Sequence, residues 1–390
     1  MSVPKLRFKE FNGAVTKNFI KDIAKTYVGR DLVEEAYSPI KTETHIYPIY
    51  SNSVDNEGLY GYYNFQEFNF DNDALTVVGR GAGLGRAFYR QGGFGTIGRL
   101  LCLIPKNKSF HPKYLSDYIN DRLIIHNESG GIPQLPRSSL ENYEVILPSY
   151  EEQTKIASFL SAVDEKISLL TKKHELLWQY KQGMMQKLFS QEIRFKADDG
   201  SEFEEWEKVR LGNYLVKHDE KTEFNNQYPV LTSSRNGIFF QKDYFSGQDI
   251  ASADTTGYNV VPYGYFTYRH MSDDLIFKFN INTLCPKGIV STLYPVFTVK
   301  PDFLNTYFLQ TILNEGQEFK NFAIMQKQGG SRTYMYFSKL VELFLTIPCL
   351  DEQTKIANFL SAIDQKIEVV AQQIEQAKEW KKGLLQQMFV

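Results

Sequence analysis

Apolar residues recur at alternating steps of four and three along two long segments of the chain. The seam positions of the first segment include Ile156, Leu160, Val163 and Ile167, and those of the second include Ile356, Leu360, Ile363 and Ile367. This heptad spacing predicts two long amphipathic helices. Each segment follows a proline and has acidic residues in its first turn, as a helix N-terminus prefers. We expect these helices over residues 148–190 and 348–390.

The two helical segments are copies of each other. At an offset of 200 residues, Pro148–Phe189 and Pro348–Phe389 are identical at 19 of 42 positions. A long helix with a single apolar stripe is poorly stable alone in water. The simplest way to bury each stripe is to pack the two copies against each other. We therefore expect one intramolecular coiled coil, which is antiparallel if a two-fold axis relates two duplicated halves of the chain.

The regions that precede the helices are related too, although more weakly. The strings YPIYSNSVDNEGLY and YPVLTSSRNGIFF begin at Tyr47 and Tyr228, TVVGRG and NVVPYG begin at Thr76 and Asn259, and GTIGRLLCLIPK and GIVSTLYPVFTVK begin at Gly95 and Gly288. Aromatic and β-branched runs, glycine and asparagine turns and short helical stretches predict an α+β fold. The expected domains are two globules, residues 1–147 and 191–347, each followed by one of the helices.

One motif opens both helices. It reads P-x-x-E-E-Q-x-K-I-A-x-F-L-x-x-x-D-x-K-I over Pro148–Ile167 and returns over Pro348–Ile367, with Asp351 in place of the first glutamate. Together with the order globule, helix, globule, helix, this motif resembles the specificity subunit of a Type I restriction-modification system. The resemblance covers essentially the whole chain.

The resemblance implies a fold and a set of partners. Each globule would be a target recognition domain that reads one half of a split, asymmetric site in double-stranded DNA, and the helices would form an antiparallel spacer. Two modification subunits, which carry S-adenosylmethionine and methylate adenine at N6, would bind the helices. Two motor-nuclease subunits would join for restriction. Mg and ATP, like S-adenosylmethionine, are expected on these partners, and no cofactor is expected in this chain.

Composition sets wider limits. The chain of 390 residues is 42% hydrophobic with a formal net charge of −2, which is typical of a soluble globular protein and not of a disordered, fibrous or membrane protein. Its three cysteines, Cys102, Cys285 and Cys349, form no C-x-x-C pair, so neither a disulfide framework nor a zinc ribbon is indicated. With no apolar stretch of membrane-spanning length, a cytoplasmic location is expected by default.

The sequence lacks the common catalytic motifs, so we do not expect catalysis by this chain. The glycines from Gly79 to Gly85 are spaced G-x-G-x-G-x-G and not G-x-G-x-x-G, and neither a phosphate-binding G-x-x-x-x-G-K-[ST] nor a zinc-binding H-E-x-x-H occurs. The Asn-Pro-Pro-Tyr type of tetrapeptide found in adenine methyltransferases is missing. A D-x-K string at Asp219–Lys221 has no suitably placed upstream acidic partner. We expect neither catalytic residues nor a metal site.

Local charge must therefore explain how a near-neutral chain binds DNA. No acidic residue occurs between Ala74 and Ser116, and the DNA-binding candidates in this region are Arg80, Gly81, Gly83, Arg86, Arg90 and Arg99. In the second globule the candidates are Ser234, Arg235, Asn236, Arg269, Lys327 and Arg332. Arginine can pair with guanine in the major groove, and flanking glycines permit a close backbone approach. The alternatives are a solvated basic loop in the first globule and strand core in the second.

The helix motif offers a second candidate surface. Its repeated polar residues are Glu152, Gln153 and Lys155 in the first copy and Glu352, Gln353 and Lys355 in the second. Seam packing does not dictate such identity, so we expect these side chains to be exposed and to bind two copies of one partner subunit. The alternative is that their identity serves only the coiled coil.

Geometry then constrains the target. Two recognition domains on one rigid spacer should read half-sites about one turn of B-DNA apart, ~10 bp centre to centre, with unread bases between them. Divergent loops on duplicated globules predict two different half-sites. Two other classes of function remain open: a coiled-coil scaffold whose globules bind protein, and a stand-alone nuclease or methyltransferase.

Overall fold

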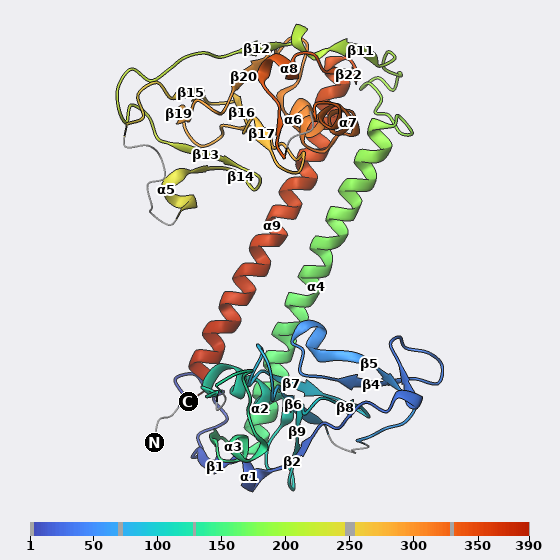
Figure 1. Cartoon of the computed structure of the whole chain (residues 1–390), viewed down its shortest axis with the longest axis vertical. Coiled ribbons are helices and arrows are strands. Elements are labelled where there is room, and N and C mark those ends of the chain that lie inside the picture. The colour runs from blue at the N-terminus through green and yellow to red at the C-terminus, as the bar shows by residue number, and fades with distance from the viewer. Residues whose placement is uncertain (1–3, 69–72, 128–129, 246–253, 328–330, 390) are drawn as a thin grey trace. The chain divides into compact units, whose positions relative to one another are not determined.

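The computed structural model describes residues 4–68, 73–127, 130–245, 254–327 and 331–389, hereafter the described residues (Figure 1). They form two compact units: unit 1 is Met1–Lys173 with Val370–Val390, and unit 2 is His174–Val369. Two long helices, α4 (Tyr150–Phe189) and α9 (Leu350–Met388), each contribute one part to each unit. The compact units therefore divide both helices, whereas the domains expected from sequence kept each helix whole.

The described residues of unit 1 form two four-stranded sheets and one two-stranded antiparallel sheet. The first sheet is antiparallel and has the order β2 (Ala24–Val28), β9 (Leu101–Pro105), β6 (Ala74–Val77), β7 (Ala87–Arg90). The second has the order β3 (Tyr37–Ser38), β5 (Leu59–Tyr63), β4 (Tyr47–Tyr50), β8 (Gly95–Thr96), with β4 and β8 parallel. Strand β1 (Thr16–Phe19) pairs with β10 (Glu144–Leu147). The short helices are α1 (Ile20–Ile23), α2 (Pro112–Arg122) and α3 (Arg137–Glu141).

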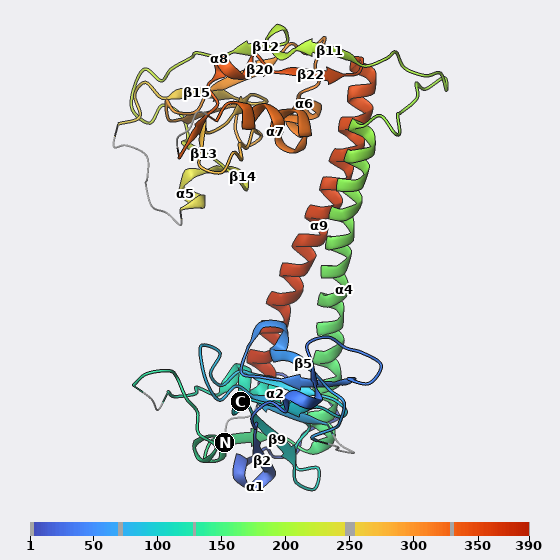
Figure 2. The same cartoon turned by 45° about the vertical axis from the view of Figure 1, so that its right-hand side comes forward.

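Unit 2 repeats this plan. Its four-stranded antiparallel sheet has the order β12 (Leu215–Lys217), β20 (Val296–Val299), β16 (Phe266–Thr267), β18 (Asn280–Ile281). The remaining pairs are β11 (Glu207–Arg210) with β22 (Phe344–Ile347), β13 (Leu231–Ser234) with β14 (Gly237–Phe240), β15 (Asn259–Pro262) with β19 (Lys287–Val290), and β17 (Met271–Ser272) with β21 (Thr333–Tyr334). Its helices are α5 (Gln241–Tyr244), α6 (Thr306–Glu315), α7 (Gln317–Met325) and α8 (Phe337–Leu340), and α6 and α7 lie side by side (Figures 1 and 2).

Equivalent asparagines mark the duplication. The side chain of Asn120 on α2 accepts a hydrogen bond from the backbone N–H of Ala87 and donates one to its carbonyl, at 2.9 and 2.8 Å. Asn314 on α6 does the same with Phe279, at 2.8 and 3.0 Å. In both units an amide side chain thus satisfies a backbone N–H and a backbone carbonyl at the outer strand of the sheet, which among the described residues pairs with a strand on one side only. The expected α+β fold with an internal duplication is confirmed.

One sequence echo is wrong in detail. Strand β6, which contains Thr76, is the third strand in the order β2-β9-β6-β7. The third strand in the corresponding sheet of unit 2, β12-β20-β16-β18, is β16. Asn259, which the sequence comparison set against Thr76, begins β15 in a separate two-stranded sheet. Short runs of β-branched residues fit many strands equally well, so local similarity does not identify which strand corresponds to which.

The seam residues of the helices are buried in the units. In unit 1, Ile156, Leu160 and Val163 are buried and Ile167 is half-buried, in one cluster with Leu384, Met388 and Phe389 of the α9 end. In unit 2, Ile356, Leu360, Ile363 and Ile367 are buried in one cluster with Met185 and Leu188 near the end of α4. Each helix start therefore packs on its own globule and on the end of the other helix.

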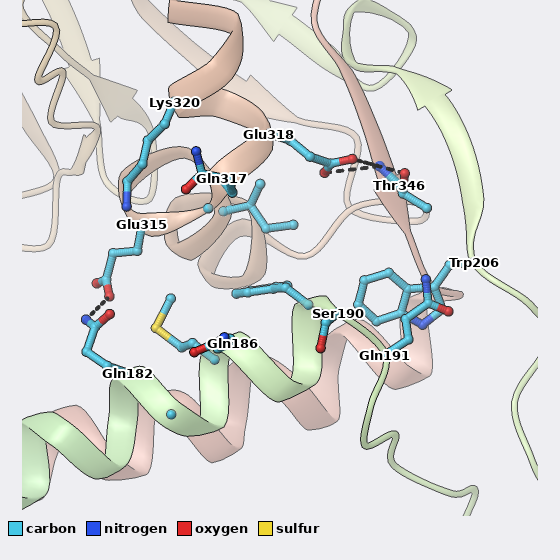
Figure 3. Close-up of a pocket in the computed structure, with 15 residues that line it drawn as sticks. Gln182, Gln186, Ser190, Gln191, Trp206, Glu315, Gln317, Glu318, Lys320 and Thr346 are labelled. Carbon is cyan, nitrogen blue, oxygen red and sulfur yellow. Dashed lines mark hydrogen bonds between the residues drawn. The ribbon is translucent and has the colours of Figure 1, made fainter.

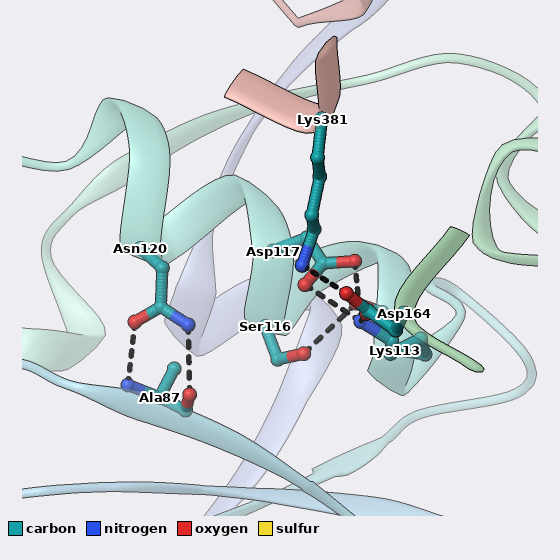
Figure 4. Close-up of polar contacts among 7 residues, drawn as sticks. All are labelled: Ala87, Lys113, Ser116, Asp117, Asn120, Asp164 and Lys381. Atoms are coloured by element: carbon teal, nitrogen blue, oxygen red, sulfur yellow. Dashed lines mark hydrogen bonds and ion pairs between the residues drawn. The ribbon is translucent and has the colours of Figure 1, made fainter. Parts of the chain in front are cut away.

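Two ion pairs define the direction of the helix pairing. Lys381 pairs with Asp164 at 2.5 Å in unit 1, and Lys181 pairs with Asp364 at 2.9 Å in unit 2. Because the early part of α4 meets the late part of α9 and the reverse, the coiled coil is antiparallel, as expected. Figure 4 shows Lys381 reaching Asp164 beside the Lys113–Asp117 pair of α2. Burial alone lowers the pKa of Lys181, but its hydrogen bonds and charge interactions with Asp364 and Glu315 raise it above the ordinary value. Lys181 therefore stays charged near neutral pH.

Candidate nucleic-acid interface

Three exposed arginines of unit 1 lie on two loops that one asparagine holds together. The side-chain carbonyl of Asn52 accepts a hydrogen bond from Gly79 N–H at 2.8 Å, and its amide donates to the carbonyl of Gly98. Arg80 and Arg99 directly follow these two glycines, and both are exposed. Exposed Arg86 closes the first loop, since its carbonyl accepts from Val78 N–H at 2.8 Å. Within the described residues, none of these three arginine side chains forms an ion pair.

The two candidate glycines of this loop have different roles. Gly81 has φ +97°, a backbone conformation that side chains disfavour, and apart from its two chain neighbours no described residue has an atom within 4 Å of the position a Cβ would take. A ligand can therefore approach its backbone. At Gly83 a Cβ would lie 2.2 Å from Cγ1 of Val54, so this glycine allows close packing of the loop on a neighbouring segment.

Arg90 is not available to a ligand, and its assignment as a DNA contact was wrong. Only 3% of the residue is exposed, and its guanidinium lies 3.6 Å from the centroid of the Tyr50 ring. It donates to Thr76 Oγ1 at 3.0 Å and to the backbone carbonyl of Glu57 at 2.5 Å. Burial lowers the pKa of Arg90. Arg90 therefore joins β7 to Thr76 and Glu57. From the basic run in the sequence, this internal role could not be distinguished from a role on the surface.

Arg90→Met should accordingly destabilise unit 1 without changing DNA specificity. The substitution leaves Thr76 Oγ1 and the Glu57 carbonyl without their donor, and an unsatisfied buried polar group costs about 1–3 kcal/mol. Thermal unfolding measures the loss, and Arg99→Met at an exposed site is the matched control, expected to stay within about 0.5 kcal/mol of the parent. Equal stability of the two variants would contradict the structural role of Arg90.

Sequence reasoning missed a fourth arginine of this surface. Arg30 is exposed, its N–H donates to the carbonyl of Thr96 at 3.2 Å, and its carbonyl accepts from Gly98 N–H at 2.9 Å. Arg99 N–H donates to Gly29 at 3.1 Å. The chain contains four Gly-Arg dipeptides, and all of them belong to these joined loops: residues 29–30, 79–80, 85–86 and 98–99. This repeated dipeptide was the signal that could have identified Arg30.

Unit 2 presents a different arrangement. Ser234, Arg235 and Arg269 line one cavity of about 370 Å³. Arg235 forms a forked ion pair with Asp274, at 2.6 and 2.8 Å, and these hydrogen bonds lower the pKa of Asp274 to about 2. Ser234 Oγ accepts from the N–H of exposed Asn236 at 3.1 Å and so shapes the hairpin turn.

The remaining two candidates of unit 2, Arg332 and Lys327, are not among the residues that line this cavity. Exposed Arg332 pairs at 2.9 Å with Asp273, which itself lines the cavity. Exposed Lys327 follows α7 and is not among the lining residues. Asn280, which sequence reasoning missed, holds the hairpin by donating to Ser233 Oγ at 2.8 Å and to the Ser234 carbonyl at 2.9 Å.

The repeated glutamates of the helix motif are buried, so the expectation that they face a partner was wrong. Glu152 is 2% exposed and accepts from Arg7 Nε at 2.8 Å, whereas Glu352 is 0% exposed and accepts from Arg194 Nη2 at 2.8 Å. Trp206 Nε1 donates to Glu352 at 3.1 Å. Each glutamate thus fastens the segment that enters its globule to the first turn of the helix.

The repeated glutamines are buried for a related reason. Gln153 accepts from His111 N–H at 2.9 Å and donates to the Pro148 carbonyl at 2.9 Å. Gln353 accepts from Asn305 N–H and donates to the Pro348 carbonyl, both at 2.9 Å. His111 and Asn305 are the N-cap residues of α2 and α6. The repeated polar residues therefore join a short helix to a long one, and they serve the fold of each unit.

The lysines of the motif stay accessible. Lys155 lies 3.6 Å from Glu10 with 54% of its side chain exposed, and Lys355 lies 2.5 Å from Asp198 with 32% exposed. The acidic partners, Glu10 and Asp198, each follow a copy of a second repeat: the string LRFK at residues 6–9 returns as IRFK at residues 193–196. In both copies the phenylalanine packs edge-on against a helix phenylalanine, Phe8 on Phe159 and Phe195 on Phe359. Sequence reasoning overlooked this short repeat.

A cavity of about 650 Å³ in unit 2 lies between the last turns of α4 and the α6–α7 pair (Figure 3). Among its polar lining residues, Gln182 donates to Glu315 at 3.3 Å, and Glu318 accepts from the N–H and hydroxyl of Thr346. Across the part of the chain that the structure describes, no group of three or more His, Cys, Asp or Glu side chains could hold a metal ion. No described helix is long and apolar enough to cross a membrane.

Comparisons with known proteins identify the family. The profile of the Type I restriction modification DNA specificity domain matches residues 14–178 and 204–379. The chain is 26% identical to the Type I restriction enzyme MjaVIII specificity subunit of Methanocaldococcus jannaschii, over 81% of this chain and 77% of that protein. It is also 26% identical to a putative type I specificity subunit of Mycoplasma pneumoniae, over 88% of each.

A solved structure has the same fold. The crystal structure of a Type-I restriction-modification system S subunit from M. genitalium superposes with a TM-score of 0.67 at 17% identity, covering 100% of this chain and 99% of that one. The first matched stretch lies mostly in unit 1 and the second mostly in unit 2, and together they cover most of the chain. The chain therefore belongs to the family of Type I restriction-modification specificity subunits, with two target recognition domains.

Proposed function

We propose that this chain is the non-catalytic DNA-recognition subunit of its complex, and that each target recognition domain reads one half of a bipartite, asymmetric DNA site. The observation that carries the proposal is the gathering of the Gly-Arg loops in unit 1, which places Arg30, Arg80, Arg86 and Arg99 on backbone segments joined by hydrogen bonds. Exposed guanidinium groups held this way suit the O6 and N7 acceptors of guanine.

The second domain supports the asymmetry of the site. Its cavity presents Ser234, Arg235 and Arg269 on a hairpin and a strand end, and no Gly-Arg loop occurs there. Asp274 neutralises Arg235, so base contacts by this arginine would require exchange of a protein carboxylate for a base acceptor. Two surfaces of such different chemistry would select two different half-sites.

The helices would set the spacing and recruit partners. Two half-sites about one helical turn apart, ~10 bp, fit two domains carried on one coiled coil. Equivalent surfaces around Lys155 and Lys355 would each receive one adenine-N6 methyltransferase subunit, since the motif occurs twice. Motor-nuclease subunits would join this assembly. S-adenosylmethionine, Mg and ATP would be bound by those partners.

Methylation mapping tests the proposal. The chain is expressed with its own modification subunit in cells that lack other DNA methylation, and methyladenine is located by single-molecule sequencing. We expect one split asymmetric motif with a fixed unread gap. Cells that carry the modification subunit without this chain are the control and should show no motif. A stable assembly with two modification subunits but no methylation would instead favour a protein-binding scaffold.

A further inference from the structure

A basic cleft lies along the outer strand β2 of unit 1. It has a volume of about 970 Å³ and is bordered by α1, β2 and α3. Its basic lining residues are Lys21, Lys25, Arg30, Lys106 and Arg137, and its acidic ones are Glu67 and Glu141. A neighbouring cavity of about 820 Å³ shares Lys25, Tyr27 and Lys106 with it and adds Lys108 and Asp73. Together the two hollows carry six basic and three acidic side chains.

Several of these charges already have partners. Arg137 pairs with Glu141 at 2.8 Å, and Glu67 accepts the N–H of Thr96 at 2.8 Å. Lys106 donates to the backbone carbonyl of Lys21, and among the residues that the structure describes its positive charge has no carboxylate in an ion pair with it. Lys25 is exposed and forms no ion pair among the described residues. The excess of positive charge therefore faces solvent along β2.

A polar group inside the cleft also lacks a partner. Thr26 lines the cleft and is only 4% exposed, yet its hydroxyl has no hydrogen-bond partner among the described residues. A buried hydroxyl without a partner is costly, so an acceptor supplied by a ligand would satisfy it. Thr26 lines the same cleft as Lys25 and Lys106, so a ligand that supplies this acceptor would be anionic.

The cleft is continuous with the Gly-Arg loops. Arg30 lines the cleft, and its backbone exchanges hydrogen bonds with Thr96 and Gly98, at 3.2 and 2.9 Å. Gly98 immediately precedes Arg99 and accepts from Asn52, which also holds the Arg80 loop. A polyanion that reaches the arginines can therefore extend along β2 without leaving the positive surface.

We propose that this cleft holds the sugar-phosphate backbone of the DNA duplex next to the half-site read by the first target recognition domain. The inference rests on the proposed function of this domain. The size of the two adjoining hollows and their lysine-rich lining suit a continuous phosphate chain, because lysine neutralises phosphates without selecting a base. Lys25 and Lys106 would each neutralise a phosphate and would not read sequence.

A salt titration separates this role from base reading. The complex of this chain with its modification subunits is measured on a duplex that contains the mapped site, with Lys25→Gln and Lys106→Gln combined. Each neutralised phosphate contributes about 0.9 to the slope of log affinity against log salt, so the slope should become shallower by about 2. The methylated motif should stay unchanged. Lys9→Gln with Lys166→Gln removes the same charge at exposed sites outside the cleft and should leave the slope unchanged.

Three outcomes would overturn the inference. A slope equal to that of the Lys9 and Lys166 control would show that the cleft does not meet DNA. A changed methylation motif would show that the lysines read bases. Loss of a partner subunit with an unchanged slope would identify an acidic protein segment as the occupant. Failure of the unsubstituted complex to bind its mapped site would instead contradict the proposed function itself.

Discussion

Glu352→Gln is expected to lower the free energy of unfolding of unit 2 by about 3 kcal/mol. Glu352 is fully buried, and its carboxylate accepts from Arg194 and from Trp206. Removing one partner of a buried ion pair leaves an uncompensated charge, which typically costs about 3–5 kcal/mol. Glutamine keeps one acceptor oxygen, so we expect the lower end of that range. For a unit of this size, the loss corresponds to a fall in Tm of about 6–12 °C.

Calorimetry of the whole chain measures this effect, and the chain offers a close control. Asp351 is the neighbouring residue, is exposed and carries the same charge, so Asp351→Asn tests the loss of a negative charge at the helix N-terminus alone. Its cost should stay below about 1 kcal/mol. Glu152→Gln should destabilise unit 1 through the equivalent contact with Arg7. If the substitutions at 351 and 352 lowered Tm equally, the buried pair would not be the cause.

The second large effect concerns DNA binding. Combining Arg80→Ala with Arg99→Ala should weaken binding to the mapped site by about 2–6 kcal/mol, since each good arginine–guanine pair is worth about 1–3 kcal/mol. This loss corresponds to between about 30-fold and 2 × 10⁴-fold in affinity. Both side chains are exposed and lie on loops joined through Asn52, so the fold should be unaffected.

Lysine at the same two positions distinguishes the two ways an arginine can act. Arg80→Lys with Arg99→Lys keeps the charge but loses the planar fork that binds guanine at two points. A base-reading role predicts that the lysine variant loses specificity while its salt dependence stays close to the parent. If the lysine variant bound and methylated the site like the parent, both arginines would contact only phosphates.

Much of the architecture follows from local patterns. The heptad seam and the offset of 200 residues predicted the two long helices, their pairing and the duplication, because a helix repeats its exposed and buried faces every few residues. Local patterns do not contain strand order, which depends on pairings between distant segments. For this reason the match of Thr76 with Asn259 was wrong. Arg30 was missed because its closeness to Arg99 depends on a parallel contact between segments about seventy residues apart.

The sequence alone therefore determined the class of fold, the duplicated plan, the long helices and the family resemblance. All of these follow from the spacing of apolar residues and from repeated strings, which are local properties of the sequence. Only the tertiary structure decided which polar residues are surface and which are internal. Glu152 meets Arg7 across 145 residues, and Glu352 meets Arg194 across 158. A charged side chain is buried only where a distant partner compensates its desolvation, and no local pattern records that partner.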